Sequence, residues 1–248
     1  MKNIVLESNA TAPQCCAVSF SLLSLDKVQD ALEVLEHATK LAPAPPSAEY
    51  ASVLFYRGQA LRRANNLDGA LAAYNDGKDM YLKCGEFTIE FCNLLAGSAI
   101  TLSKLKRRDD SLRACEEGSA YFVKCGARDT EDYANHLKIW GRTLFDGGDV
   151  ASALPKYEEA KEIFERIEKT QNVWYVGVLA ERALALANMG QENEAAVGVD
   201  AAAKIIGDIG GTGTPQHKRL LEVAAKISHT PEGCASKTVD LKCNYACQ

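Results

Sequence analysis

The sequence predicts an all-α fold made of about five helical hairpins in a row, closed by one further helix. Residues 140–160, WGRTLFDGGDVASALPKYEEA, carry the pattern most clearly, because small and apolar residues at helical spacing lie on both sides of a Gly-Gly-Asp turn. Small anchor residues recur in steps of 39, 41, 42 and 42 residues, at Ala31, Ala70, Ser111, Ala153 and Ala195. We therefore expect one helical unit repeated five times.

Composition places the chain among ordinary globular proteins. It has 248 residues, of which 47% are hydrophobic and 25% charged, and a net charge of -5. This acidic balance argues against nucleic acid or anionic membrane as a partner, and no apolar run has the length of an integral membrane segment. Six of the nine cysteines fall inside helical patterns as small hydrophobes, which favours a reducing, cytoplasmic location.

The first hairpin is expected over residues 12–43. Thr11 can cap its first helix and Pro13 can occupy the first turn. Three prolines within residues 43–46 then exclude a continuing helix, so this stretch is expected to link the first two hairpins.

The second and third hairpins are expected over residues 51–85 and 92–126. The ending Tyr-Leu-Lys-Cys-Gly85 of the second is echoed 41 residues later by Phe-Val-Lys-Cys-Gly126. Both glycines are predicted to take the left-handed conformation that ends many helices.

The fourth and fifth hairpins are expected over residues 134–168 and 176–209, which brings the array to residues 1–209. Pro155 in the fourth predicts either a helix that begins late, near Ser152, or a kink. Residues 210–228 are expected to form a linker and a capping helix that starts at Pro215, and residues 229–248 a cysteine-containing tail. The apolar stripe of the capping helix is predicted at Leu220, Leu221 and Ala224.

The spacing within residues 140–160 resembles that of the tetratricopeptide repeat (TPR). Trp140-Gly141, Leu144 and the series Ala153, Leu154, Tyr157 and Ala160 carry this resemblance. Steps near 42 exceed the usual repeat of about 34 residues, so helices about a turn longer are expected. The resemblance implies a right-handed α-solenoid of about five TPR-like helical hairpins plus a C-terminal capping helix.

The resemblance also implies that the first helix of each hairpin lines a concave groove. Five positions of each such helix, taken on hairpins two to four, sum to five positive charges and one negative charge, a net charge of +4. The partner-binding candidates among them are Phe55, Gln59, Arg62, Arg63, Asn93, Lys104, Asn135, Lys138, Arg142 and Phe145. Either the groove binds an acidic peptide or protein, or it is a solvated face of mixed charge.

We therefore predict a non-catalytic scaffold or adaptor for protein-protein interaction, with no cofactor, either alone or as a subunit of a larger multiprotein complex. No hydrolase, kinase or dinucleotide motif occurs in the sequence. One alternative is an adaptor like the soluble NSF attachment proteins of vesicle fusion, which residues 70–190 resemble. Another is a cochaperone-type TPR that binds acidic C-termini, although Lys138 with Arg142 departs from the Lys and Asn of that clamp.

The C-terminal tail holds four residues of types that bind zinc. They are His229, Cys234, Cys243 and Cys247. Their spacing contains no Cys-x-x-Cys pair, so free thiols are the other interpretation, and no metal site is predicted elsewhere.

Overall fold

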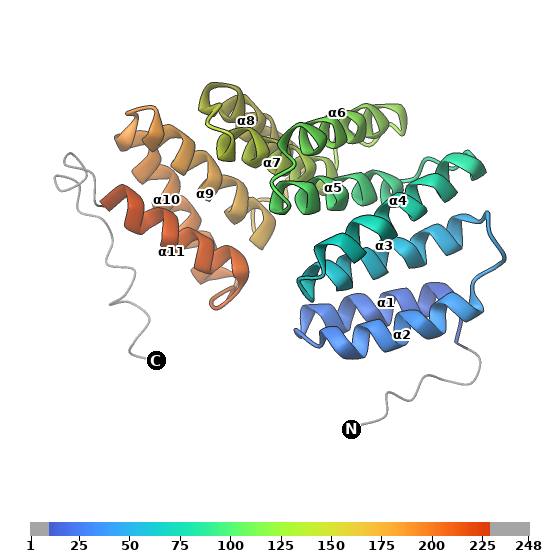
Figure 1. Cartoon of the computed structure of the whole chain (residues 1–248). Helices are drawn as coiled ribbons and strands as arrows, with labels where there is room; N and C mark the ends of the chain where they lie inside the picture. Colours follow the sequence, from blue (N-terminus) through green and yellow to red (C-terminus); the bar gives the residue numbers. More distant parts are fainter. Residues whose placement is uncertain (1–9, 229–248) are drawn as a thin grey trace. The chain divides into compact units, whose positions relative to one another are not determined.

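The computed structural model describes residues 10–228, which contain eleven α-helices and no β-strand (Figure 1). The chain divides after Cys125 into two compact units. Unit 1 contains α1 (Ala12–Ser24), α2 (Val28–Leu41), α3 (Ala48–Arg63), α4 (Leu67–Cys84), α5 (Ile89–Lys104) and α6 (Arg108–Lys124). Unit 2 contains α7 (Glu131–Asp146), α8 (Val150–Arg166), α9 (Val173–Asn188), α10 (Glu192–Asp208) and α11 (Pro215–Ser228). The predicted fold class, helical hairpins followed by a capping helix, is confirmed.

One turn geometry joins the two helices of every hairpin. A residue with positive φ stands in each turn, and the backbone N–H of the next residue donates to a leucine carbonyl five residues earlier, at 2.9 to 3.0 Å. The residues with positive φ are Asp26, Asn65, Lys106, Gly148 and Gly190, and the leucines are Leu22, Leu61, Leu102, Leu144 and Leu186. Each positive-φ residue lies five positions before an anchor residue, so the sequence repeat and the turn have the same period. This bond satisfies a carbonyl that the end of the first helix would otherwise leave unpaired.

The second helix begins immediately after this turn. Asn66 accepts a hydrogen bond from the Gly69 N–H at 3.0 Å, and Asp149 accepts one from the Ser152 N–H at 3.1 Å. These side chains supply partners for N–H groups at helix starts. The Gly-Gly-Asp turn expected from the sequence is therefore observed.

Small residues on the first helix allow the second helix to approach closely. A Cβ added to Gly58 would lie 2.5 Å from Cε1 of Tyr74, and one added to Gly141 would lie 2.7 Å from Cε1 of Tyr157. Both tyrosines are fully buried. At the equivalent positions the third hairpin has Ala99 with Cys115 and the fifth has Ala183 with Val199, so a larger first residue accompanies a smaller second one.

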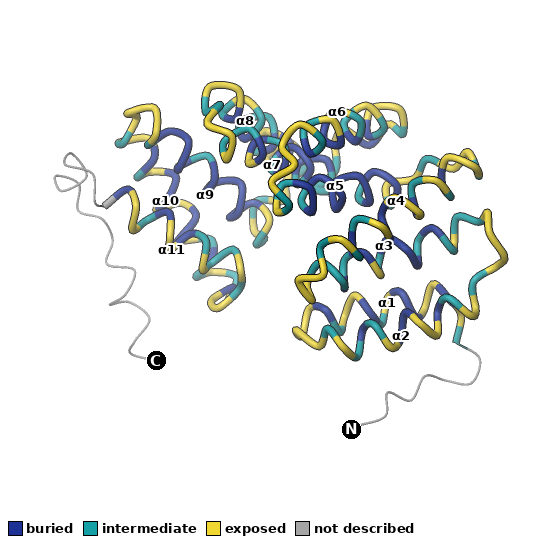
Figure 2. Tube along the Cα trace, in the orientation of Figure 1, coloured by how far each residue is buried: buried dark blue, intermediate teal, exposed yellow. Residues whose placement is uncertain are grey.

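Successive hairpins pack through their first helices. In unit 1, α1 contacts α3 and α3 contacts α5, and in unit 2, α9 contacts both α7 and α11. The second helices α2, α4 and α8 each lie against the next first helix. The first helix α9 is the most enclosed example in unit 2 (Figure 2). Eleven of its sixteen residues are buried, because α7, α8, α10 and α11 all pack against it.

The capping helix α11 covers α9 and α10. Its buried side chains are Leu220, Val223 and Ile227, whereas Leu221 is 36% exposed. The predicted stripe was therefore wrong at Leu221, because the helix turns the residues spaced i, i+3 and i+7 toward its neighbours.

The proline in α8 is accommodated without shortening the helix. The helix runs from Val150 to Arg166 with Pro155 inside it, so the predicted late start near Ser152 is wrong. Pro155 lacks the N–H that would bond the carbonyl of Ala151, and both residues are exposed, so water can satisfy that carbonyl. Gly85 and Gly126 have φ of 69° and 68°, which confirms the left-handed conformation predicted for them.

The pairing of small and large residues gives a stability prediction. We expect Gly141→Ala to lower the free energy of unfolding by about 1–3 kcal/mol, since the new methyl group would overlap Tyr157. Adding Tyr157→Val should cost less than the sum of the two single changes, because the double variant reproduces the Ala and Val of the fifth hairpin. Urea unfolding of the four proteins measures this coupling. Additive losses would show that the two positions do not share one packing space.

Candidate functional site: the faces of the first helices

One buried carboxylate ties together the helices α7, α9 and α11 of unit 2. Glu181 of α9 is 4% exposed. Arg219 of α11 donates to both of its oxygens, each at 3.0 Å, and Nη1 of Arg142 of α7 donates to Oε1 at 3.1 Å. A buried carboxylate requires such partners, so this cluster holds α11 against the array.

Further charges surround this carboxylate. Asp146 lies 3.7 Å from Arg142, Glu222 lies 3.2 Å from Arg219, and Lys138 lies on the same helix as Arg142. Lys138, Arg142 and Arg219 thus face Asp146, Glu181 and Glu222, three cations against three carboxylates. The face of unit 2 is therefore balanced in charge.

Glu181, which lies in the fifth hairpin, was not identified from the sequence, because the groove positions were assigned on hairpins two to four. A signal was present in the sequence. The residues VWYVGVLAERALALAN of α9 are apolar or small except for Glu181, Arg182 and Asn188. A carboxylate inside such an apolar helix indicates a buried group with a cationic partner.

Lys138 lies over α9, where the backbone leaves room for its amine. Its Nζ is 5.2 Å from the centre of the Trp174 ring, and a Cβ added to Gly177 would lie 3.4 Å from the same atom. Burial lowers the pKa of Lys138 to about 8; Glu181 opposes this shift and Arg142 adds to it. Its ammonium group is therefore only weakly held in the charged form.

In unit 1 the candidate cations have different surroundings. Arg63 donates to the carbonyl of Leu23 at the end of α1, so it joins α1 to α3. Arg62 forms no ion pair within the described residues, and its guanidinium lies beside the buried hydroxyl of Tyr74. Lys104 is exposed at the end of α5.

The remaining candidates are uncharged. The prediction that Phe55 contacts a partner is wrong. Its side chain is 5% exposed and belongs to the core of unit 1, where its ring centre lies 5.0 Å from that of Tyr56. Phe145 is half-buried against the core of unit 2. Gln59, Asn93 and Asn135 are also half-buried. The convergence of all five cations on one strip remains a prediction.

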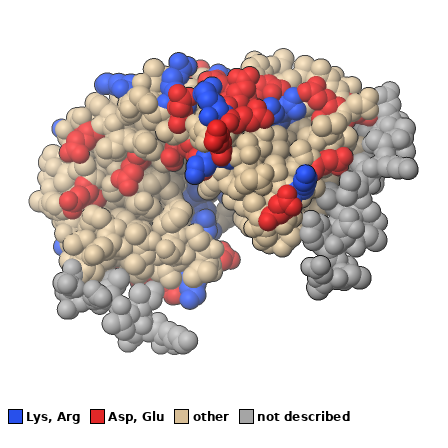
Figure 3. Space-filling view, turned by 180° about the vertical axis from the view of Figure 1, so that it is seen from behind, with Lys and Arg blue, Asp and Glu red and all other residues tan. Residues whose placement is uncertain are grey.

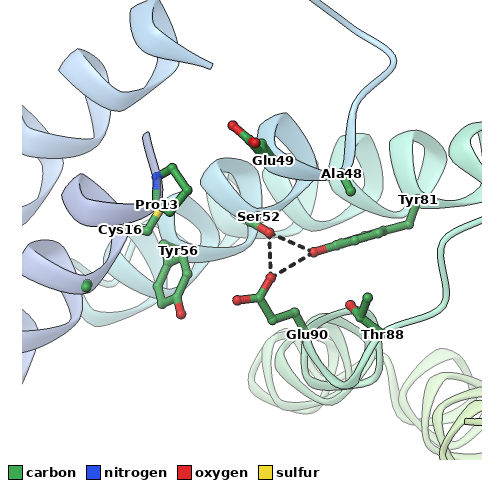
Figure 4. A pocket seen from close by; sticks show the side chains of 10 residues that line it. Pro13, Cys16, Ala48, Glu49, Ser52, Tyr56, Tyr81, Thr88 and Glu90 are labelled. Carbon is green, nitrogen blue, oxygen red and sulfur yellow. Dashed lines mark hydrogen bonds between the residues drawn. The ribbon is translucent and has the colours of Figure 1, made fainter. Parts of the chain in front are cut away.

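A pocket of about 300 Å³ lies among α1, α3, α4 and α5 of unit 1 (Figure 4). At its base Ser52 Oγ donates to Oε2 of Glu90 at 2.5 Å and lies 3.0 Å from Oη of Tyr81. Tyr81 donates to the same oxygen at 3.3 Å. Sequence reasoning did not single out Glu90, which precedes the first repeat position of α5.

On the face drawn in Figure 3, Asp and Glu side chains gather most densely along the upper edge, with Lys and Arg side chains beside them. No group of three His, Cys, Asp or Glu residues within residues 10–228 could hold a metal ion. The tail candidates His229, Cys234, Cys243 and Cys247 lie outside the described residues. Among the helices that the structure describes, none is long and apolar enough to cross a membrane.

A scan of protein-family models finds no match to the sequence, and a search of curated proteins finds none either. Solved structures are similar in fold. A Rap protein complexed with competence and sporulation factor matches with a TM-score of 0.72 and 14% identity, over 90% of this chain and 65% of that chain. The fold is that of TPR-like repeats.

Two further structures support this assignment of the fold. TTC0263, a TPR protein of Thermus thermophilus, matches with a TM-score of 0.62 and 13% identity, over 87% of this chain and all of that chain. TPR-like repeats of a protein described as a kinesin light chain of Podosopora anserina match with a TM-score of 0.64 and 13% identity, over 81% of this chain and 96% of that chain. At such identity the likeness extends to the fold alone.

The buried carboxylate gives a second stability prediction. We expect Arg219→Met to lower the free energy of unfolding by about 2 kcal/mol, because Glu181 would keep only the half-exposed Arg142. The matched control is Arg166→Met, which removes an exposed pair with Asp129 and should cost less than about 1 kcal/mol. Urea unfolding measures both, and equal losses would mean that Glu181 does not hold α11.

Lys138 gives a pH-dependent prediction. Its folded pKa of about 8 lies below the ordinary lysine value of 10.5, so between these values the unfolded chain binds more protons and the free energy of unfolding rises with pH. We expect the stability of the wild type relative to Lys138→Met to increase from about pH 7.5 to about pH 9.5. Urea unfolding across that range tests this, and a constant difference would contradict burial of the amine.

Proposed function

We propose that this protein is a non-catalytic scaffold that binds a protein or peptide partner on the faces of its first helices. The proposal rests on the surroundings of Arg62. Arg142 and Arg219 are matched by the buried Glu181, whereas Arg62 has no carboxylate partner within the described residues and lies beside the neutral hydroxyl of Tyr74. The Arg62 side chain is partly exposed, so a carboxylate of a partner could pair with a positive charge that no carboxylate of the described residues compensates.

The solved structures of similar fold support binding of this kind. Two of them are Rap proteins in complex with a peptide or factor: one with competence and sporulation factor, and the plasmid pLS20 regulator with the Phr* peptide, whose TM-score is 0.65. Those ligands belong to those proteins. For this chain the likeness supports a peptide or protein ligand of its own.

The charge distribution favours an acidic partner on unit 1. The face of unit 2 carries as many carboxylates as cations, whereas the last turn of α3 carries Arg62 and Arg63, of which Arg63 has Asp26 nearby. An exposed charge pair contributes at most about 1 kcal/mol, so several contacts would have to act together. Such binding should weaken with salt.

A cytoplasmic location is also proposed. None of the six cysteines of the described residues forms a disulfide, and four of them are buried in the helical core. Buried free thiols fit a reducing compartment.

The experiment starts from a partner that co-purifies with the full chain from native extract in fixed stoichiometry. We expect Arg62→Gln to weaken its binding by at least about fivefold, since a charge-assisted hydrogen bond would be lost. The matched control is Arg57→Gln on the same helix, because Arg57 is exposed beside Glu33 and Glu36 of α2 rather than on this face. Calorimetry at low and high salt would measure both, and equal effects would remove Arg62 as the contact.

A further inference from the structure

The pocket at the N-terminal ends of α3 and α5 has the chemistry of a site for an organic cation. Its walls come from four helices and are mostly apolar or aromatic, with Pro13 and Cys16 from α1, Ala48 and Tyr56 from α3, and Tyr81 from α4. Glu90 of α5 stands at the base, and Glu49 lines the rim (Figure 4). Small pockets with apolar walls and one convergent charge are suited to a single side chain or a small ligand.

Glu90 is held in place by hydroxyl groups and not by a cation. Both Ser52 and Tyr81 bond the same oxygen, Oε2, and within the described residues Oε1 has no hydrogen-bond partner and the carboxylate no ion pair. Figure 4 shows Oε1 directed away from Ser52 and Tyr81, toward the side of the pocket where Tyr56 lies. The carboxylate is thus oriented in advance with one acceptor open.

The groups around Glu90 are neutral. Burial is the main cause that raises the pKa of Tyr56 and of Cys16 to about 12 each, and the charge of Glu90 adds to both shifts. Neither group is ionised near pH 7, so the carboxylates supply the charge of the pocket. The Tyr56 ring offers a π-face, which attracts cations.

We propose that this pocket binds a primary ammonium group on an aliphatic stem, namely the side chain of a lysine from a protein partner. The methylene groups would lie against Pro13, Ala48 and Tyr56, and the ammonium would donate to Oε1 of Glu90. A metal ion does not suit the site, because one carboxylate with hydroxyl groups falls short of the ligands that such ions require.

The proposal does not depend on the acidic partner of Arg62. Arg62 lies ten residues beyond Ser52 on α3, which is about 15 Å along the helix. The two sites can therefore be tested separately, and failure of one leaves the other standing.

The probe is Nα-acetyl-lysine N-methylamide, which carries the lysine ammonium as its sole charge, titrated into the full chain and followed by amide chemical shifts. We expect saturable shifts at Ser52, Tyr56 and Glu90, and at least about tenfold weaker binding in Glu90→Gln. The amide of glutamine keeps an acceptor for Ser52 and Tyr81, so the fold should persist. The matched control is Glu131→Gln, which removes a first-turn carboxylate of α7 in unit 2 and should leave binding unchanged.

The Nε-acetylated form of the same probe separates charge from apolar contact. It should bind at least about tenfold more weakly, since it keeps the stem but loses the ammonium. Should Glu90→Gln fail to fold, Tyr81→Phe serves instead, and loss of one hydrogen bond to Glu90 should weaken binding a few-fold. Equal binding of the two probes, unchanged binding in these variants, or no saturable shift in the wild type would each overturn the proposal.

Discussion

Close approach between the two helices of each hairpin is the constraint on which this structure depends. At Gly58 and Gly141 the first helix has no side chain, and the ring of Tyr74 or Tyr157 fills the space. In the third and fifth hairpins the first helix has an alanine at this position, and the facing residue, Cys115 or Val199, is smaller than tyrosine. Protein interiors tolerate neither voids nor overlap. The combined volume of the two side chains at each pair of positions is therefore restrained more tightly than the volume of either one.

The same period appears in the turns, and this explains why the sequence predicted the helices so well. Every hairpin turn places a left-handed residue five positions before the anchor, whatever the residue is. The shorter step of 39 residues between the first two hairpins arises elsewhere, because α2 has four residues fewer than α4, 14 against 18, whereas the link after it, residues 42–47, is two residues longer than residues 85–88. Pro43 and the prolines after it follow the end of α2, and these were visible in the sequence.

Side-chain environments were harder to predict from repeat positions. Phe55 occupies a position expected to face a groove, yet its ring lies among Tyr56, Tyr74 and other core residues. Glu181 was overlooked although it organises the charges of unit 2. Both cases have one physical reason: the repeat pattern fixes the backbone, whereas burial depends on the volume and charge contributed by residues about 40 positions away, such as Arg142 and Arg219.

Charged groups that are paired inside the fold are less available to a binding partner than charged groups that are not. A cation that compensates a buried carboxylate stabilises the fold, and removing it exposes the cost of the unpaired group. Arg142 and Arg219 pair with the buried Glu181, and Arg63 donates to the Leu23 carbonyl. Within the described residues Arg62 has no carboxylate partner and Oε1 of Glu90 has no hydrogen-bond donor. These two groups have opposite charge and lie toward opposite ends of the first helices of unit 1. A partner that satisfied both would need a cationic and an anionic group about 15 Å apart, which four or five extended residues can span.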